Sequence, residues 1–371
     1  MKQGWEIKKL GEVATYVNGF AFKPEHWRET GMPIIRIQNL NNSNAEFNYC
    51  DVDIPEKFVV EDGDILISWS ASLGVYEWNR GKAYLNQHIF KVVFNKVDIN
   101  KYFLKYAVNA KLNDMLKDAH GATMKHIVKG DFDNTIIPYP PREEQERIVE
   151  ELDCLSGVIE KKREQLKQLD ALAQSIYYQM FGDPIINEKG FPVYKIDDII
   201  TFQGGSQPDK SHFEYEPTDD NIRLIQIRDY KSDKNITYIP KSLARRLCNA
   251  EDIMIGRYGP PIFQILKGIE GAYNVALMKA IPKQGNREFI RAFLKQKCLL
   301  EYLESMSKRT AGQDGIQMDK LKAYPFPLPP IELQDEFANK IALIEKQQEL
   351  IKKSIAQTEE LFNSRMAYYF N

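Results

Sequence analysis

A long internal repeat limits this chain to folds built from two similar halves. Residues 5–20 reappear as residues 191–206, with the apolar pattern kept and the polar residues changed. Later landmarks recur at nearly the same offset: residues 64–68 match 252–256, and residues 137–141 match 326–330. Because this offset is close to half of the 371 residues, two complete copies fill the chain. Such a duplication predicts internal pseudo-two-fold symmetry and two equivalent functions.

The composition is that of an ordinary globular protein. With 43% hydrophobic and 27% charged residues, the chain can bury the cores of two or three domains. No run approaches the roughly 18 apolar residues of a membrane span, and the N-terminus does not resemble a signal peptide, so we expect a cytoplasmic protein with no membrane contact. The four cysteines are far apart and form no CxxC pair, which predicts neither a zinc site nor a disulfide framework.

Two acidic segments stand out when the net charge of −2 is divided along the chain. Residues 141–182 and 330–371 have net charges of −3 and −2, whereas residues 1–140 are neutral and residues 183–329 have a net charge of +3. Each acidic segment follows a proline run, and prolines and carboxylates are both favoured at a helix N-terminus. Both segments are therefore predicted to be helices, of about 40 residues and roughly 60 Å each.

Apolar residues recur in both segments at three- and four-residue steps, the pattern of a coiled-coil seam. The predicted seam residues are Ile148, Leu152, Leu155, Ile159, Leu166, Leu169, Ile176, Ile341, Ile344, Ile351, Ile355 and Phe362. Helices this long need a partner, and the two equivalent helices are expected to pack on each other. Three polar seam residues, Lys162, Gln348 and Thr358, would weaken the pairing and help to set its register. The alternative is that each helix packs only on its own domain.

The remaining segments are predicted to be mixed α/β domains. Short β-branched and aromatic runs at residues 33–37, 64–67 and 89–94 alternate with turn residues, and residues 101–115 and 287–306 have helical patterns. The predicted organisation is a first domain at 1–140, a long helix at 141–182, a second domain at 183–329 and a second long helix at 330–371.

No catalytic or metal-binding motif is present in the sequence. The phosphate-binding GxxxxGK[ST] loop, HExxH, GxSxG and a convincing GxGxxG are all absent. The five histidines lack metal-ligand spacing. Asp64 and Asp252 are matched carboxylates, but each precedes a predicted strand, as turn acids often do. We therefore assign no catalytic residue and no metal ligand.

Polar residues differ between the copies at matched places. Residues 36, 38 and 39 correspond to 226, 228 and 229, residues 68–71 correspond to 256–259, and the loop 120–125 corresponds to the hydrophilic loop around residues 308–313. Arginine, glutamine and asparagine are the side chains that recognise purine edges in the major groove. The predicted DNA-contacting residues are Arg36, Gln38, Asn39, Ser68, Trp69, Ser70, Thr123, Lys125, Gln226, Arg228, Arg257, Tyr258, Lys308, Arg309 and Gln313. The alternative at each position is a solvated loop.

Three features together resemble the specificity subunit of a type I restriction–modification enzyme. The first is W-x-x-x-x-L-G-[DE]-[VI] at residues 5–13, with its copy at 191–199. The second is I-P-x-P-P-x-x-E-Q-x-x-I at residues 137–148, whose copy at 326–337 contains Gln334. The third is the long helix after each proline run. The resemblance covers the whole chain and implies two target-recognition domains separated by two helices that form an antiparallel coiled coil.

The resemblance also implies a function. The protein would be non-catalytic, with each domain contacting one half of a split duplex DNA site and the coiled coil setting the gap. A half-site separation near one helical turn, about 34–36 Å, would suit such helices. Two methyltransferase subunits that use S-adenosylmethionine would dock on the chain. Restriction subunits that use ATP and Mg would join them in a complex that also cuts DNA, and the sequence leaves open whether the complex cuts DNA or only methylates it. No cofactor is expected in this chain itself.

Two departures from the family pattern affect these expectations. The form G-x-x-G that the family commonly shows is present at Gly256–Gly259 but is replaced by Ser68, Trp69 and Ser70 in the first copy, so DNA contact by this loop is better supported in the second domain. The second long helix also has three polar seam positions, which predicts a weaker pairing.

Two other function classes fit parts of the sequence. A single-chain methyltransferase or nuclease would need an NPP[YF] motif or a clustered acidic site, and no NPP tripeptide occurs. A coiled-coil scaffold without DNA specificity explains the helices but leaves two large, divergent domains without a role. We therefore favour the specificity subunit.

Overall fold

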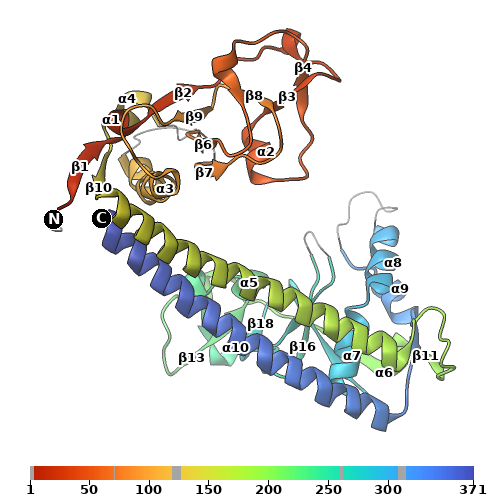
Figure 1. Cartoon of the computed structure of the whole chain (residues 1–371). Coiled ribbons are helices and arrows are strands. Elements are labelled where there is room, and N and C mark those ends of the chain that lie inside the picture. Colours follow the sequence, from red (N-terminus) through yellow and green to blue (C-terminus); the bar gives the residue numbers. More distant parts are fainter. Residues whose placement is uncertain (1–3, 71, 119–126, 259–261, 308–314) are drawn as a thin grey trace. The chain divides into compact units, whose positions relative to one another are not determined.

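The computed structural model describes residues 4–70, 72–118, 127–258, 262–307 and 315–371. The chain divides into two compact units, one formed by Met1–Glu164 with Lys352–Asn371 and the other by Gln165–Ile351. Each unit contains one globular domain and parts of two 40-residue helices, α5 (Arg142–Phe181) and α10 (Ile331–Phe370) (Figure 1).

The first unit contains both ends of the chain. Strand β1 (Glu6–Lys9) pairs antiparallel with β10 (Ile136–Tyr139), which leads through the proline run into α5. The ring of Trp5 stacks on Tyr369, near the end of α10, with the ring centroids 6.4 Å apart. The short helix α1 (Leu10–Val13) follows β1, and its two apolar ends are fully buried.

Two four-stranded sheets form the body of the first domain. One has the order β2 (Thr15–Asn18), β9 (Ile89–Val93), β6 (Ile65–Ser68) and β7 (Gly74–Glu77). The other has the order β4 (Asn48–Cys50), β3 (Met32–Ile35), β8 (Ala83–Leu85) and β5 (Val59–Val60), and only β3 and β8 are parallel in the described part of these sheets. Every residue of β6 is buried, because Ile65 and Ile67 belong to one core and Leu66 to another.

Helices complete the first domain. Helices α3 (Lys101–Asp118) and α4 (Lys129–Asn134) pack over one face of the β2-β9-β6-β7 sheet. The shorter elements are α2 (Ile37–Asn41) and the 3₁₀ turns η1 (Pro24–His26) and η2 (Glu56–Phe58).

The second domain repeats this topology. Its strand pair is β11 (Val193–Lys195) with β20 (Pro325–Pro327). One of its sheets has the order β12 (Ile200–Gly204), β19 (Leu277–Pro282), β16 (Ile253–Gly256) and β17 (Gln264–Lys267). The other has the order β14 (Tyr238–Pro240), β13 (Asn221–Ile225), β18 (Gly271–Tyr273) and β15 (Leu247–Cys248). The parallel pair β13–β18 corresponds to β3–β8. The predicted mixed α/β class with two pseudo-symmetric domains is confirmed.

The helices of the second domain also follow the first. They are α6 (Ile196–Ile199), α7 (Arg287–Leu294), α8 (Lys297–Ser307) and α9 (Met318–Ala323), with the 3₁₀ turns η3 (Lys210–His212), η4 (Ile227–Tyr230), η5 (Asp233–Asn235) and η6 (Lys241–Leu243). The helical stretch predicted at 287–306 forms two helices, because the chain leaves α7 at Lys295 and the Gln296 amide donates to the Ala292 carbonyl before α8 begins.

Each long helix contributes to both cores. The first core contains Ile148 and Leu152 from the start of α5 together with Phe370 from the end of α10. The second core contains Phe337 from the start of α10 together with Phe181 from the end of α5. The end of α5 therefore supplies core residues to the second domain, which follows it directly, and the end of α10 supplies core residues to the first domain, which is distant in sequence. The predicted spacer segments did not include this role.

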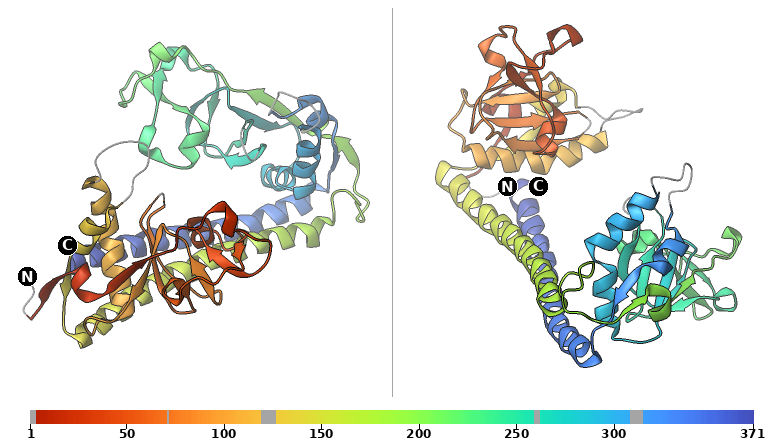
Figure 2. Two further views of the ribbon diagram at one scale, coloured as in Figure 1. Left: turned by 90° about the horizontal axis from the view of Figure 1, so that it is seen from above. Right: turned by 90° about the vertical axis from the view of Figure 1, so that its right-hand side faces the viewer.

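The two helices run antiparallel within each unit. In the first unit, the Tyr369 hydroxyl donates to Glu151 at 2.6 Å, and Arg163 pairs with Glu359 at 2.6 Å. Residue numbers therefore fall along α10 as they rise along α5. The views in Figure 2 show the helices side by side in both units. The predicted antiparallel pairing is confirmed.

The seam has the burial expected for a helix pair. All twelve predicted apolar seam residues are buried or half-buried. The polar seam residues are half-buried and hydrogen-bonded: Lys162 donates to the Ser354 hydroxyl, and Gln348 donates to Asp170 at 2.7 Å. Satisfied polar groups of this kind define the register of a helix pair.

Two glutamines fasten the start of each long helix to its domain. Gln145 is 1% exposed; it accepts from the Asn100 backbone N–H and donates to the Pro140 carbonyl, both at 2.8 Å. Gln334 is equally buried and makes the same two bonds in the second unit, with the Asn286 N–H at 2.8 Å and the Pro329 carbonyl at 2.6 Å. The glutamine of the repeated proline motif is therefore a structural residue.

Candidate nucleic-acid interface

A groove in the first domain contains two of the predicted DNA-contacting residues. Its volume is about 400 Å³. Its lining residues are Phe22, Trp27, Arg36, Ile37, Gln38, Asn86, Gln87, His88 and Ile89. The Arg36 guanidinium lies 5.5 Å from the Trp27 ring centroid and donates to the Asn48 side chain at 3.0 Å. Gln38 is exposed. The groove thus has amide, guanidinium and aromatic groups within one recess.

Asn39 differs from the prediction, because its side chain faces inward. It is 1% exposed, its amide donates to the carbonyls of Ala45 and Glu46, and its carbonyl accepts from the Arg36 N–H at 3.0 Å. These bonds occupy its polar atoms within the α2 loop. Asn39 therefore holds Arg36 and Gln38 in place and does not face the groove.

The loop after β6 also turns its polar groups inward. Ser68 is fully buried and donates to the Ser70 carbonyl, and Ser70 is 8% exposed. The Trp69 indole donates to the Asn18 side chain at 3.2 Å, and its ring stacks on Phe90 at 5.7 Å. The Ser68 hydroxyl and the Trp69 indole are thus both bonded within the domain in this conformation.

Five predicted contact residues lie outside the described part of the chain. They are Thr123, Lys125, Lys308, Arg309 and Gln313. Their proposed role depends on the sequence alone.

In the second domain, Gln226 and Arg228 lie together. The Gln226 amide and the Arg228 guanidinium both donate to the hydroxyl of Thr237, at 3.1 and 2.9 Å, and Thr237 is fully buried. Arg228 is exposed. Asp229 occupies the position of Asn39: it is 6% exposed and accepts from the Gln226 N–H at 2.9 Å. Burial raises the pKa of the Asp229 carboxyl above its usual value.

Arg257 and Tyr258 form a second polar and aromatic pair. The Arg257 guanidinium lies 5.3 Å from the Tyr258 ring centroid, and the tyrosine is 49% exposed. Within the described residues, neither Arg257 nor Arg228 has a carboxylate partner at ion-pair distance. Arginines without a carboxylate partner are suited to contacts with phosphates and bases, and Arg257 also lies beside an exposed aromatic ring.

A family model described as the type I restriction modification DNA specificity domain matches residues 2–170 and again residues 188–360. The chain belongs to this family. It holds two copies of the specificity domain, one in each half of the internal repeat. The predicted function is thereby confirmed: the chain is a DNA-specificity subunit and not a catalytic one. The scaffold alternative finds no support.

Three curated specificity subunits are similar to this chain over nearly its whole length. The EcoBI specificity subunit of Escherichia coli is 23% identical over 99% of this chain and 85% of its own length. The EcoKI specificity subunit of Escherichia coli K12 is 23% identical over 100% and 89%. The MjaVIII specificity subunit of Methanocaldococcus jannaschii is 22% identical over 96% and 90%.

Solved structures share the fold. The crystal structure of a type I restriction–modification S subunit from M. genitalium superposes with a TM-score of 0.58 at 13% identity, covering 99% of this chain and 96% of that one. A chain from a study of complex assembly and conformational transition in the type I system superposes at 0.55 with 18% identity, covering 99% and 97%.

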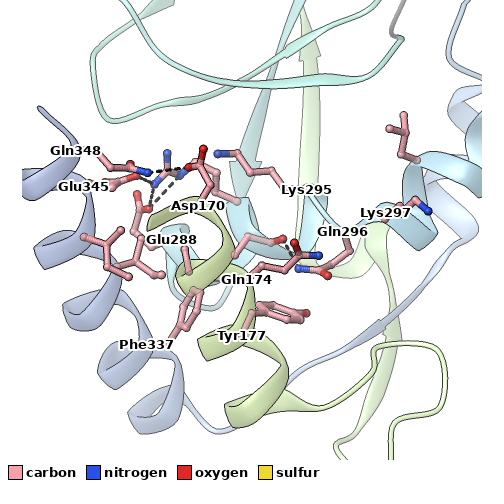
Figure 3. Close-up of a pocket in the computed structure, with 16 residues that line it drawn as sticks. Asp170, Gln174, Tyr177, Glu288, Lys295, Gln296, Lys297, Phe337, Glu345 and Gln348 are labelled. Carbon is pink, nitrogen blue, oxygen red and sulfur yellow. Dashed lines mark hydrogen bonds and ion pairs between the residues drawn. The ribbon is translucent and has the colours of Figure 1, made fainter. Parts of the chain in front are cut away.

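The specificity subunit also has a pocket of about 560 Å³ between α5, α7 and α10 in the second unit (Figure 3). Tyr177 and Phe337 form part of its apolar wall. Arg291 is 6% exposed and is paired with Glu288 and Glu345.

The described residues also lack a candidate metal site and a membrane-spanning helix. They contain no group of three His, Cys, Asp or Glu side chains that could hold a metal ion, and no helix among them is long and apolar enough to cross a membrane. All four cysteines are free.

Proposed function

We propose that the first domain recognises one half of a bipartite duplex site through Arg36 and Gln38, and that the second domain recognises the other half through Gln226, Arg228 and Arg257. The observation that supports this most is that, in both copies, a capping residue with the same hydrogen bond lies next to polar side chains that differ between the copies. The capping residue keeps its place and its hydrogen bond at Asn39 and Asp229. The neighbouring side chains change from Arg36 and Gln38 to Gln226 and Arg228, although the backbone enters α2 and the 3₁₀ turn η4 at nearly the same angles, φ −114° and ψ 163° at residue 36 and φ −122° and ψ 162° at residue 226.

Such a change on a constant scaffold is suited to recognising two different base sequences. Arginine pairs with guanine and glutamine with adenine through bidentate hydrogen bonds in the major groove, and each good pair discriminates by about 1–3 kcal/mol. The loops at 120–125 and 308–313 would add contacts through Thr123, Lys125, Lys308, Arg309 and Gln313.

The same proposal includes the partners. Two methyltransferase subunits would supply S-adenosylmethionine chemistry on adenine, and restriction subunits would supply ATP- and Mg-dependent cleavage. The antiparallel helices would set the gap between half-sites, and the cytoplasm, where the chromosome lies, is the expected location. We assign partner docking to the α5–α10 pair and the pocket beside Arg291, whose open apolar wall is available to a protruding side chain.

The decisive experiment is sequencing of methylated bases in cells that express this chain with its neighbouring methyltransferase, and in cells that lack the chain. A split adenine-methylated motif that disappears on deletion is the expected result. An unchanged methylome, with the methyltransferase shown to be active, would contradict the proposal.

A single substitution then tests the second domain. Arg228→Ala should weaken binding by about 1–3 kcal/mol at one base position and relax selection there, while leaving the other half of the motif unchanged. Lys189→Ala, which removes an exposed cation from the loop after α5, is the matched control and should leave the selected motif unaltered. Equal weakening on all sequences would reassign Arg228 to a phosphate contact.

A further inference from the structure

The turn between β8 and β9 has the same backbone geometry as its counterpart between β18 and β19. The Asn86 N–H donates to the Ile35 carbonyl at 3.2 Å, and the Asn274 N–H donates to the Ile225 carbonyl at 3.0 Å. The end of each turn is closed in the same way, by bonds of 3.2 Å to the Asn86 carbonyl and 3.0 Å to the Asn274 carbonyl.

A glycine lies against each turn and restricts its position further. A Cβ atom on Gly19 would lie 2.1 Å from the Asn86 carbonyl oxygen, and a Cβ on Gly205 would lie 2.0 Å from that of Asn274. Only glycine permits such close approach of two backbones. Both turns are therefore rigid supports that can hold a side chain in a defined place.

The side chains on these turns differ completely. The first turn presents Gln87 and His88, whereas the second presents Val275 and Ala276. Gln87 is half-buried and His88 is exposed, and their side-chain nitrogens are 3.3 Å apart. Both residues line the groove that contains Arg36 and Gln38. The Gln87 amide thus lies in the groove where a base edge would enter. Its present partner is the exposed His88 ring, which a base edge can replace.

Val275 occupies the same place in the second domain. It is 46% exposed, and the Arg257 guanidinium donates to its carbonyl at 3.4 Å. The Asn274 N–H donates to the Ile225 carbonyl. Val275 directly follows Asn274 and Gln226 directly follows Ile225, so Val275 and Gln226 are neighbours in space. An exposed valine therefore lies among the arginine and glutamine side chains assigned to DNA recognition.

We propose that this turn holds a base-recognising residue in each domain: Gln87 contacts an adenine and Val275 contacts the methyl group of a thymine. This inference rests on the proposed function and adds a position that the sequence comparison of the copies did not identify. A glutamine amide bonds adenine through two atoms at once, because its carbonyl oxygen accepts from N6–H and its NH2 group donates to N7, and apolar side chains contact the C5-methyl of thymine.

Base analogues test each contact at the level of single atoms. Replacing an adenine by 7-deazaadenine removes the N7 acceptor, and replacing a thymine by uracil removes only the methyl group. The complex of this chain with its methyltransferase subunits is titrated with duplexes that carry its methylated motif, with one base replaced at a time.

For Gln87, the wild-type complex should lose about fivefold in affinity at one adenine of the motif when N7 is removed. Gln87→Ala should bind the natural duplex about fivefold more weakly and show no further loss at that adenine, since coupled contacts are not additive. Asn79→Ala, at an exposed position in the loop between β7 and β8, is the control and should keep the full sensitivity.

For Val275, the wild-type complex should lose about fourfold when one thymine of the other half-site becomes uracil. Val275→Ala should be insensitive at that thymine. Val193→Ala, an exposed valine in β11, should behave as the wild type. The exchange variant Gln87→Val should lose its sensitivity to 7-deazaadenine and so excludes a purely structural effect of the alanine change.

The outcomes separate this inference from the proposed function. A wild-type complex that shows no preference for the motif over a scrambled duplex would contradict the proposed function itself. A wild-type complex that prefers the motif, together with variants that keep every analogue sensitivity of the wild type, would overturn the assignment of Gln87 and Val275 alone.

Discussion

Replacement of Gln145 by leucine tests the anchoring of the long helix to the first domain. The change nearly keeps the volume but leaves two buried groups unsatisfied, the Asn100 N–H and the Pro140 carbonyl. An unsatisfied buried group costs about 1–3 kcal/mol, so the first unit should lose about 2–6 kcal/mol of unfolding free energy. That is a large share of the roughly 5–15 kcal/mol that stabilises a typical domain.

Tryptophan fluorescence during urea unfolding measures this loss in one unit. The four tryptophans, Trp5, Trp27, Trp69 and Trp78, all belong to the first unit. With a slope of about 2 kcal/mol per M urea, the fluorescence midpoint should fall by about 1–3 M.

Two variants serve as controls for this measurement. Gln357→Leu changes an exposed amide of α10 in the same unit and should shift the midpoint by no more than the roughly 0.5 kcal/mol typical of surface substitutions. Gln334→Leu breaks the equivalent bonds in the second unit and should leave the tryptophan midpoint nearly unchanged. A shift below about 0.3 M for Gln145→Leu, or an equal shift for Gln334→Leu, would refute the assignment of a local anchoring role.

Three further perturbations have defined expectations. Deletion of residues 366–371 removes apolar side chains of α10 from the first core and should lower the tryptophan-monitored stability by at least about 3 kcal/mol, whereas a deletion of Asn371 alone should not. Arg291→Met should destabilise the second unit by about 3–5 kcal/mol in calorimetry, because it leaves Glu288 and Glu345 without their buried cation. Burial works to raise the pKa of Glu345, but hydrogen bonds from Lys267 and Arg291 outweigh it and hold the pKa below the usual value. This carboxylate therefore contributes stability above its unfolded pKa of about 4.3 that is lost as the pH falls through the lower folded pKa, and Glu345→Gln should remove that part of the acid dependence.

The repeat and the apolar periodicity were sufficient to predict the architecture. Strand runs at 64–67 and 89–94 correspond to β6 and β9, and the seam residues of both long helices are buried or half-buried. These features follow from local pattern, since a stripe at helical spacing must be covered by a partner. The break between α7 and α8 was missed because residues 287–306 remain apolar at helical spacing across it.

The contribution that the end of each long helix makes to a domain core could not be predicted from pattern. Phe181 and Phe370 lie at the apolar ends of their helices, where the sequence does not distinguish a seam residue from a core residue. The distinction depends on which elements meet at the end of each helix. That is a property of tertiary packing, and periodicity contains no information about it.

The candidate site shows the same division between local and tertiary information. Asparagine and aspartate are used both for base contacts and for capping helices, and only the structure shows that Asn39 and Asp229 are the capping pair. The alignment of the copies also overlooked Gln87, because two changed residues in a short turn between buried strands have no distinguishing pattern. It becomes significant only when the groove brings it beside Arg36 and Gln38. A change of DNA specificity should therefore vary residues 36, 38 and 87 together while keeping residue 39, since loss of the capping bond would displace the neighbours whose contacts are being changed.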